Sequence, residues 1–371
     1  MSKKQVSRRD FLRRSAVAAA GAGAAISGVG AGCGWAQVKK ENIPKRVLGR
    51  TGLKVTELSF GGTRLGDRAV LNYGIDRGIN FIHAHPGYNR GKAFPEFCAV
   101  VKERRNEVVF GMKLLEDELS EERLDDILGD LGIEYTDILA PGIHTVEEIA
   151  SPALKDFLLA MKQKGKAKSI GFAVHRNEPD VLARAVELEY FDLVLLAYNA
   201  SNLAQLDPIV EKMEKIGMGF VAMKTLKGLQ RASEQDREKA VKSALNNPKV
   251  DTVIRGFTTK DEVDTFINWT LTRTAGVAPD DRRRLAAKMA GVNCTMCGNC
   301  GICPRNVAVC DIFRFQYYAE DGQLDVARDE YAALPASQCV GACDLCGLCE
   351  EVCSNNIPIR QRLQEVHSLL A

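Results

Sequence analysis

A repeating pattern decides the fold of this chain, and residues 168–196, KSIGFAVHRNEPDVLARAVELEYFDLVLL, contain one full period of it. The apolar run Lys168–Phe172 predicts a buried strand, and Phe191–Leu195 predicts a second one. Between them, Pro179–Leu188 has the apolar spacing of an amphipathic helix. The stretch therefore predicts a βαβ unit with parallel strands.

The same period recurs from residue 46 to about residue 284. Eight repeats over about 240 residues are typical of a (β/α)₈ TIM barrel, an α/β fold. A doubly wound open sheet remains the alternative, because periodicity alone cannot close a barrel. Further helices are expected at Ser120–Leu131, Ser151–Lys164 and Asp207–Lys215. The remaining strands are expected at Thr56–Phe60, Ile79–His83, Val108–Met112, Thr136–Leu139, Gly219–Met223 and Thr252–Ile254.

Several short motifs resemble landmarks of the aldo/keto reductase family. Residues 46–55, RVLGRTGLKV, are similar to the β-hairpin that opens the family's barrel, and residues 78–82, GINFI, to the approach to its catalytic strand end. Residues 164–171 and the pair Tyr198-Asn199 match further landmarks. The resemblance runs through the whole barrel and implies carbonyl reduction with NADP(H).

The resemblance also implies a catalytic site, at Tyr88, Lys113, His83 and His144. In the family a tyrosine protonates the carbonyl oxygen, a lysine lowers the pKa of that tyrosine, an aspartate pairs with the lysine, and a histidine orients the substrate. Here His83 takes the aspartate position, and Gly142 takes the position of the histidine, with His144 nearest to it. A histidine cannot supply the fixed negative charge of an aspartate. We therefore expect a degenerate tetrad and weak reduction of simple aldehydes.

The nucleotide end departs from the family as well. Residues 253–259, VIRGFTT, resemble the phosphate-binding strand end, with Arg255, Gly256, Thr258 and Thr259 as the implied cofactor contacts. Arg255 replaces a usual proline, and Phe266 stands where an asparagine commonly contacts adenine.

Four histidines fall near predicted strand ends and raise the question of a transition-metal site. They are His83, His85, His144 and His175. The simpler interpretation, hydrogen-bonded loop-end histidines, is favoured because no carboxylate of suitable spacing completes the set.

Ten of the twelve cysteines lie between Cys294 and Cys353. Three cysteines at C-x₂-C-x₂-C spacing can bind one face of an iron–sulfur cubane, and in two-cluster ferredoxins the last cysteine of each motif binds the other cluster. The spacing predicts two [4Fe–4S] clusters. One would be held by Cys294, Cys297, Cys300 and Cys353, and the other by Cys343, Cys346, Cys349 and Cys303.

Zinc is the alternative for these cysteines, although zinc sites usually take cysteines in pairs. Disulfides are less favoured, because adjacent C-x₂-C pairs would close strained rings. The tail resembles the ferredoxin-like extension of a subgroup of aldo/keto reductases, including Tyr317-Tyr318 and residues 327–331. The tail departs from that extension in the shorter spacing before Cys303 and in the serine at 354 after the final motif. It also has two extra cysteines, Cys310 and Cys339, either of which could substitute as a ligand.

The N-terminus resembles a leader for export of folded proteins. Residues 7–12, SRRDFL, resemble the twin-arginine motif, an Ala/Gly stretch follows, and residues 34–36 are suited to a signal peptidase. A basic, disordered N-terminus is the alternative reading, and Cys33 raises the option of a lipid-modified N-terminus. The expected organisation is a signal peptide at 1–36, a linker at 37–45, the barrel at 46–288 and a small cysteine-rich ferredoxin-like α domain at 289–371.

Charge and hydropathy limit the classes of partner that the protein can bind. The net charge is +2; residues 1–36 carry +5 and the rest of the chain carries −3, so the body is nearly neutral and gives no case for nucleic-acid binding. No membrane span is expected in the mature protein. Two functions follow: a periplasmic iron–sulfur oxidoreductase with an unknown redox partner, or an iron–sulfur electron-transfer or binding protein whose barrel is not a carbonyl reductase. The twin-arginine export machinery is the other expected partner.

Overall fold

The computed structural model describes residues 39–273 and 279–371, so the predicted leader with Cys33 lies outside the described residues. Eight parallel strands form a closed ring in the order β6-β5-β4-β3-β11-β10-β9-β8, and the pairing of β6 with β8 closes it. The barrel is therefore confirmed over the open sheet. The strands are β3 Leu58–Gly61, β4 Phe81–Ala84, β5 Val109–Met112, β6 Thr136–Leu139, β8 Ala167–Val174, β9 Leu193–Ala197, β10 Gly219–Met223 and β11 Thr252–Arg255, with a short β7, Gly142–Ile143, beside the second half of β8.

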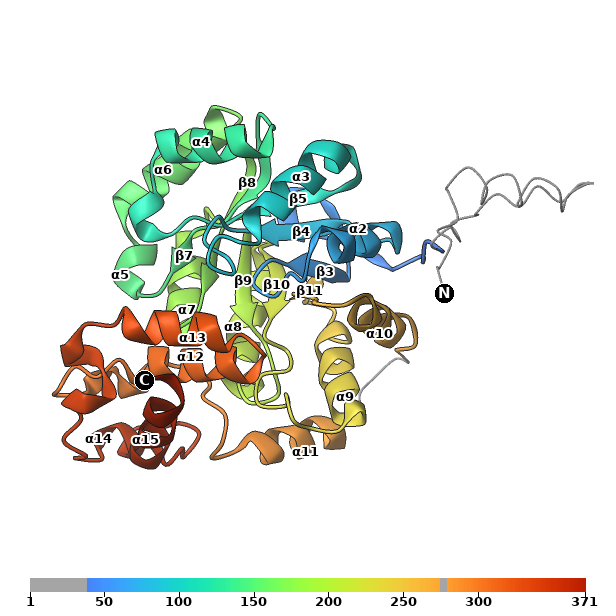
Figure 1. Ribbon diagram of the computed structural model, residues 1–371. Coiled ribbons are helices and arrows are strands. Elements are labelled where there is room, and N and C mark those ends of the chain that lie inside the picture. The colour runs from blue at the N-terminus through green and yellow to red at the C-terminus, as the bar shows by residue number, and fades with distance from the viewer. Residues whose placement is uncertain (1–38, 274–278) are drawn as a thin grey trace, which may run out of the picture. The chain divides into compact units, whose positions relative to one another are not determined.

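Helices surround the strands on the outside of the ring (Figure 1). Side-chain caps fix several of their starts, because Ser120, Ser151 and Thr259 each accept a hydrogen bond from a first-turn amide. The helices are α2 Arg68–Asp76, α3 Phe94–Arg104, α4 Glu121–Leu131, α5 Val146–Ile149, α6 Pro152–Gln163, α7 Glu178–Leu188, α8 Leu203–Lys215, α9 Glu234–Leu245, α10 Lys260–Leu271 and α11 Pro279–Met289, with 3₁₀ turns η1 Gly49–Thr51, η2 Arg105–Glu107 and η3 Glu116–Glu118.

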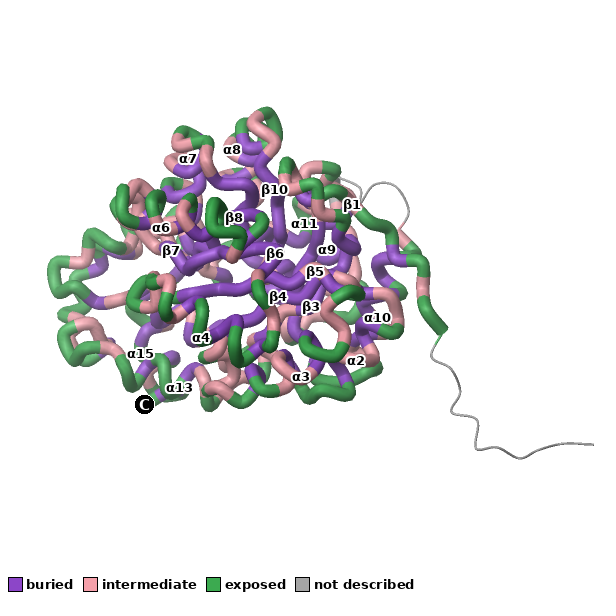
Figure 2. The backbone as a smooth tube through the Cα atoms, turned by 90° about the horizontal axis from the view of Figure 1, so that it is seen from above, coloured by how far each residue is buried: buried purple, intermediate pink, exposed green. Residues whose placement is uncertain are grey.

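The predicted opening hairpin is confirmed and covers one end of the barrel. Strands β1 Lys45–Val47 and β2 Lys54–Thr56 pair antiparallel. Leu48 and Val55 of this hairpin pack against the side chains that fill the barrel interior. Gly49 at the turn has a φ of +47° and lies so close to the backbone of Gly219 that a β-carbon would collide with it. Figure 2 shows the result, a buried strand ring inside a shell of helices with exposed outer faces.

The residues after α11 form helices and 3₁₀ turns around a hydrophobic core of their own. That core begins at Val307, whereas the barrel core ends at Met289. The elements are η4 Asn299–Ile302, α12 Val309–Glu320, α13 Leu324–Ala332, η5 Ala336–Gln338, η6 Val340–Ala342, α14 Leu348–Glu351 and α15 Ile359–Leu370. Within the described residues, no helix is long and apolar enough to cross a membrane.

Candidate functional site

A cavity of about 110 Å³ lies at the carboxyl ends of the barrel strands, where TIM-barrel enzymes have their active sites. Part of its wall comes from the barrel, including His83, Tyr88, Lys113, Arg255 and Gly256 of the predicted site. The rest comes from the tail, through α12 and the residues after it. The tail residues are Tyr317, Tyr318, Asp321 and Gln323.

His83 ends strand β4 with its side chain inside the barrel mouth. It is 3% exposed, and burial lowers its pKa to about 3, with Lys113 adding to the effect. Its Nε2 atom has no hydrogen-bond partner among the described residues. The imidazole is therefore neutral and points a free polar atom into the cavity region.

Tyr88 lies on the loop after β4 and packs across Gly62. Burial raises the pKa of Tyr88, and the neighbouring Tyr318 of the tail raises it further. Lys113 is not among the groups that shift this pKa. The Tyr88 hydroxyl is therefore protonated at neutral pH.

Lys113 follows strand β5 and turns toward a residue that the sequence did not assign to the site. Its Nζ lies 3.3 Å from Nε2 of His175, which follows strand β8. The lysine can take this path because residue 142 is glycine: a β-carbon there would lie 2.8 Å from Cε of Lys113. Gly142, which stands where the family has a histidine, therefore leaves room for the Lys113 side chain to contact His175.

The histidines do not gather around a metal. No three His, Cys, Asp or Glu side chains within residues 39–273 and 279–371 could hold a single metal ion. His85 Nε2 lies 2.8 Å from Glu118 Oε2. His144 is not a lining residue of the cavity; its ring stacks near that of His175 at 5.8 Å, and burial lowers its pKa to about 2.

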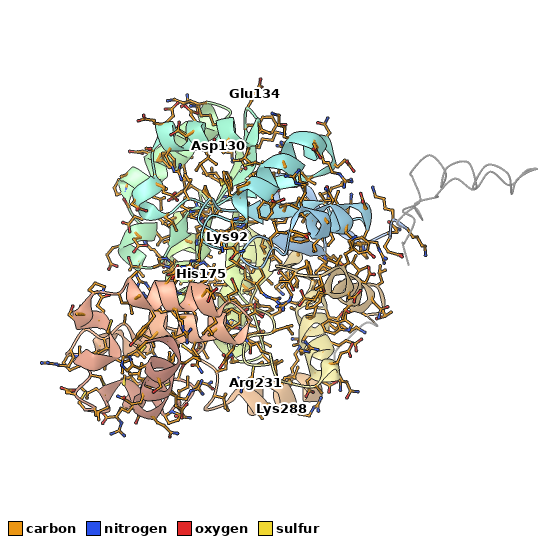
Figure 3. The ribbon with its side chains drawn as sticks, in the orientation of Figure 1. Lys92, Asp130, Glu134, His175, Arg231 and Lys288 are labelled. Carbon is orange, nitrogen blue, oxygen red and sulfur yellow. The ribbon has the colours of Figure 1, made fainter. Side chains whose placement is uncertain are left out.

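His175 has a second lysine on its other side. Nζ of Lys224, the residue after β10, lies 3.2 Å from His175 Nδ1. Lys224 has a φ of +53°, an uncommon conformation for a residue with a side chain. Figure 3 labels His175 where the barrel strands approach the helices of the tail.

The predicted nucleotide contacts are engaged inside the protein. The Thr258 amide donates to Glu262 at 2.8 Å, and Thr259 caps helix α10. Arg255 pairs with the carboxylate of Asp321 at 3.4 Å. Neither threonine lines the cavity.

Asp321 of the tail joins two arginines at this end of the cavity. Arg64, after β3, lies 3.6 Å from the same carboxylate and 3.2 Å from Glu262. The side chains of Arg64, Arg255 and Asp321 are 13%, 14% and 9% exposed. A dinucleotide phosphate that approached these guanidinium groups would compete with Asp321 for them.

The two cysteine motifs have matching backbones. Met296 and Leu345, two residues after the first cysteine of each motif, have φ values of +60° and +61°. Gly298 and Gly347 follow with +85° and +88°. The turns before the last cysteine of each motif differ, as the different spacing of those cysteines requires. Cys300 and Cys303 are three residues apart across a 3₁₀ turn, and Cys349 and Cys353 are four apart at an α-helical turn.

The four cysteines of the second predicted group lie together, and so do three of the first group, Cys294, Cys297 and Cys300. A cavity is lined by Cys303, Cys343, Cys346 and Cys349, which are the four residues assigned to the second cluster. In the first group, Cys294 and Cys297 both lie close enough to Cys300 to raise the pKa of its thiol.

Backbone amides near the first group of cysteines point at sulfur atoms. The Met296 amide approaches the Cys294 thiol at 3.5 Å, and the Ile357 amide approaches Cys353 at 3.4 Å. The Cys310 thiol donates to Sδ of Met296 at 3.5 Å, and Cys310 lowers the pKa of Cys294, whereas Cys339 donates to the Leu334 carbonyl. Among the described residues, no cysteine is in a disulfide.

Sequence reasoning did not assign three residues that line the cavity, His175, Lys224 and Asp321. His175 carried a signal, as a histidine just after a predicted strand, and Lys224 follows another strand. Asp321 carried none, because it is 66 residues from Arg255 in the chain. Other cross-domain contacts are the Arg176–Asp311 pair at 2.7 Å and the hydrogen bond from Lys227 Nζ to the Cys294 carbonyl at 2.7 Å.

Comparison with solved structures finds the same barrel. The aldo-keto reductase AKR11C1 from Bacillus halodurans superposes with a TM-score of 0.56 at 19% identity, covering 67% of this chain and 96% of the other. An aldo-keto reductase from Klebsiella pneumoniae, solved with NADPH, gives 0.53 at 16% identity, covering 66% and 94%. Structural similarity at such low sequence identity shows the fold alone. A search of curated proteins finds no match to the chain. The profile of the aldo/keto reductase family matches residues 57–279, more than half of the sequence, and the chain belongs to that family.

Proposed function

We propose that this aldo/keto reductase family member is an exported iron–sulfur oxidoreductase with two [4Fe–4S] clusters in its tail and a degenerate catalytic tetrad. The observation that carries the proposal is the cavity lined by Cys303, Cys343, Cys346 and Cys349. These four cysteines come from two motifs about forty residues apart, in the crossed combination typical of two-cluster ferredoxins. When bound, each cluster would exchange one electron at a time.

The residues present fit such clusters. Positive-φ residues in both motifs turn the chain tightly, and amides near Cys294 and Cys353 point at sulfur, as cluster thiolates require. The thiolates of a cubane bind irons at separate corners, so they stand farther apart than the ligands of one ion. This is compatible with the lack, among the described residues, of a single-ion site.

The residues at the barrel mouth do not fit bound NADP(H) in this conformation, because Asp321 and Glu262 hold the groups that would contact phosphate. This favours the second candidate, an iron–sulfur electron-transfer or binding protein whose barrel does not reduce carbonyls. The unacidified Tyr88 favours it as well. Bound nucleotide in purified protein would decide for the reductase.

The test of the clusters is iron and acid-labile sulfide analysis of anaerobically purified protein. We expect a brown protein with about eight irons and eight sulfides. Cys346→Ser should lose about half of them, whereas Cys98→Ser, in the barrel, should lose none. Stoichiometric zinc without sulfide would overturn the proposal.

Export is tested separately. Replacing Arg8 and Arg9 by lysine should leave the protein in the cytoplasm, because the twin-arginine route reads both. A double variant that still reaches the periplasm would show the assignment to be wrong. Lipid attachment at Cys33 is tested by Cys33→Ser, which would release a membrane-bound protein.

A further inference from the structure

The two groups of cysteines have different surroundings, and the difference carries an inference that rests on the clusters proposed above. The barrel holds the first group. Nζ of Lys227, on the loop after β10, donates to the carbonyl of Cys294 at 2.7 Å, and the amide of Glu178, where α7 begins, donates to the carbonyl of Met296 at 3.2 Å. Within the described residues, no hydrogen bond joins residues 343–349 of the second motif to the barrel. The cavity of the second group is lined by tail residues alone.

Hydrogen bonds to sulfur also distinguish the two groups. In the first group Cys294, Cys297 and Cys353 each accept one such bond, at 3.4 or 3.5 Å. The donor to Cys297 is the Ser354 hydroxyl, and the other two donors are backbone amides. In the part of the chain that the structure describes, no other residue donates to a sulfur of the second group. Donors to cluster sulfurs stabilise the reduced, more negative state and so raise the reduction potential.

Lys227 adds a buried positive charge on the side of the first group. It is 3% exposed, and within residues 39–273 and 279–371 it forms no salt bridge to a carboxylate. Burial lowers the pKa of Lys227, and the negative charge of Cys294 opposes that shift. The four thiolates of a bound cluster would oppose it more strongly, so the side chain stays an ammonium group.

The acid beside Lys227 does not cancel this charge. Glu178 is 0% exposed, and neither of its carboxyl oxygens has a hydrogen-bond partner among the described residues. An ionised carboxylate buried without partners would be very costly, so Glu178 is the neutral acid. Burial accordingly raises its pKa to about 8.

The second group is open to solvent and has no comparable cation. Cys346 is exposed, and the adjacent Leu345 is 50% exposed. The guanidinium group near these residues belongs to Arg360, whose side chain is 48% exposed and pairs with Glu350 at 2.8 Å. Its charge is therefore compensated by a carboxylate and screened by water.

We propose that Lys227 holds the first cluster at a higher reduction potential than the second, so that an electron from a one-electron donor enters at the exposed second cluster and moves to the cluster beside the barrel. Reduction adds one negative charge, which a fixed cation stabilises most where water is excluded. In the transfer the second cluster loses one electron and is oxidised, the first gains it and is reduced, and no covalent bond changes. Lys227 contacts a backbone carbonyl rather than sulfur or iron, so it is a positioning residue.

The experiment is a reductive titration of anaerobically purified full-length protein with dithionite, followed by electron paramagnetic resonance. The wild type should show two one-electron steps that differ by at least about tenfold in equilibrium constant, or about 59 mV. Cys346→Ser, which removes the second cluster, should keep the higher step, and Cys297→Ser should keep the lower one. The reverse order, or two equal steps in the wild type, would overturn the proposal without any variant of Lys227.

Substitutions of Lys227 separate its charge from its hydrogen bond. Lys227→Gln keeps a donor for the Cys294 carbonyl but has no charge, so it should lower the higher step by at least about tenfold and leave the lower step in place. Lys227→Arg, which keeps the charge, should titrate like the wild type, and so should the control Lys92→Gln, at an exposed position of the barrel.

The iron content distinguishes the possible failures. A Lys227→Gln protein that holds about eight irons and titrates like the wild type would overturn this inference alone. A wild-type protein without iron and sulfide would overturn the cluster proposal and this inference with it. If Lys227→Gln fails to fold, the order of the steps in the two cysteine variants still decides.

Discussion

Removing the carboxylate of Asp321 tests whether the tail occupies the phosphate end of the barrel. In Asp321→Asn, Arg64 keeps Glu262 at 3.2 Å, but Arg255 loses the partner at 3.4 Å. Orphaning one member of a buried pair costs about 3–5 kcal/mol. These pairs are longer than close contacts and about a tenth exposed, so we expect about 2 kcal/mol. At about 2 °C per kcal/mol for a large domain, Tm should fall by about 4 °C.

The same substitution should improve binding of NADPH. The nucleotide phosphate no longer has to displace an internal carboxylate, and a relief of about 1.4 kcal/mol corresponds to a tenfold lower Kd. The assay is fluorescence titration of NADPH into wild type, Asp321→Asn and the control Asp325→Asn, an exposed aspartate on the neighbouring helix α13. Micromolar binding by the wild type, or equal Kd values in all three proteins, would refute the idea that Asp321 blocks the site.

Three further predictions concern the barrel. Steady-state NADPH oxidation with simple aldehydes should be near background in the wild type, and His83→Asp should raise it, because a carboxylate beside Lys113 favours its charged form; wild-type turnover of about 1 s⁻¹ or more that Tyr88→Phe abolishes would contradict this. Gly142→Ala should push Lys113 away from His175 and lower the free energy of unfolding by about 1–3 kcal/mol, measured by urea denaturation; an unchanged midpoint would mean that the lysine moves freely. Burial raises the pKa of Asp251 from 3.8 to about 6, so the folded state holds this proton more tightly than the unfolded chain does. This contribution to the free energy of unfolding is lost as pH rises from about 4 to 6. Asp251→Asn should flatten that part of the profile of unfolding free energy against pH by up to about 3 kcal/mol, and a profile identical to the wild type would refute the assignment.

The barrel was predictable because its strands are local apolar runs. Thr136–Leu139 and Gly219–Met223 have the bounds expected from sequence. Strand β8 is longer than expected, since its first half pairs with β6 and its second half with β7, so Ala173 and Val174 continue a strand that the sequence marks only to Phe172.

The site was less predictable, because its contacts join residues distant in the chain. The family register placed Tyr88 and Lys113 at one cavity. It could not indicate that Lys113 would turn to His175, which depends on the space left by Gly142. No local pattern marks Asp321 as the partner of Arg255.

The polar contacts between the tail and the barrel have a consequence for handling in air. Arg90 with Asp329, Arg176 with Asp311, and Lys227 with the backbone of Cys294 attach the cysteine-rich tail to loops that surround the barrel mouth. If the tail holds the proposed clusters and oxygen destroys one of them, a loosened tail would release these loops and open the mouth to solvent. On this assignment, an aerobic preparation would differ from an anaerobic one in the barrel as well as in the tail.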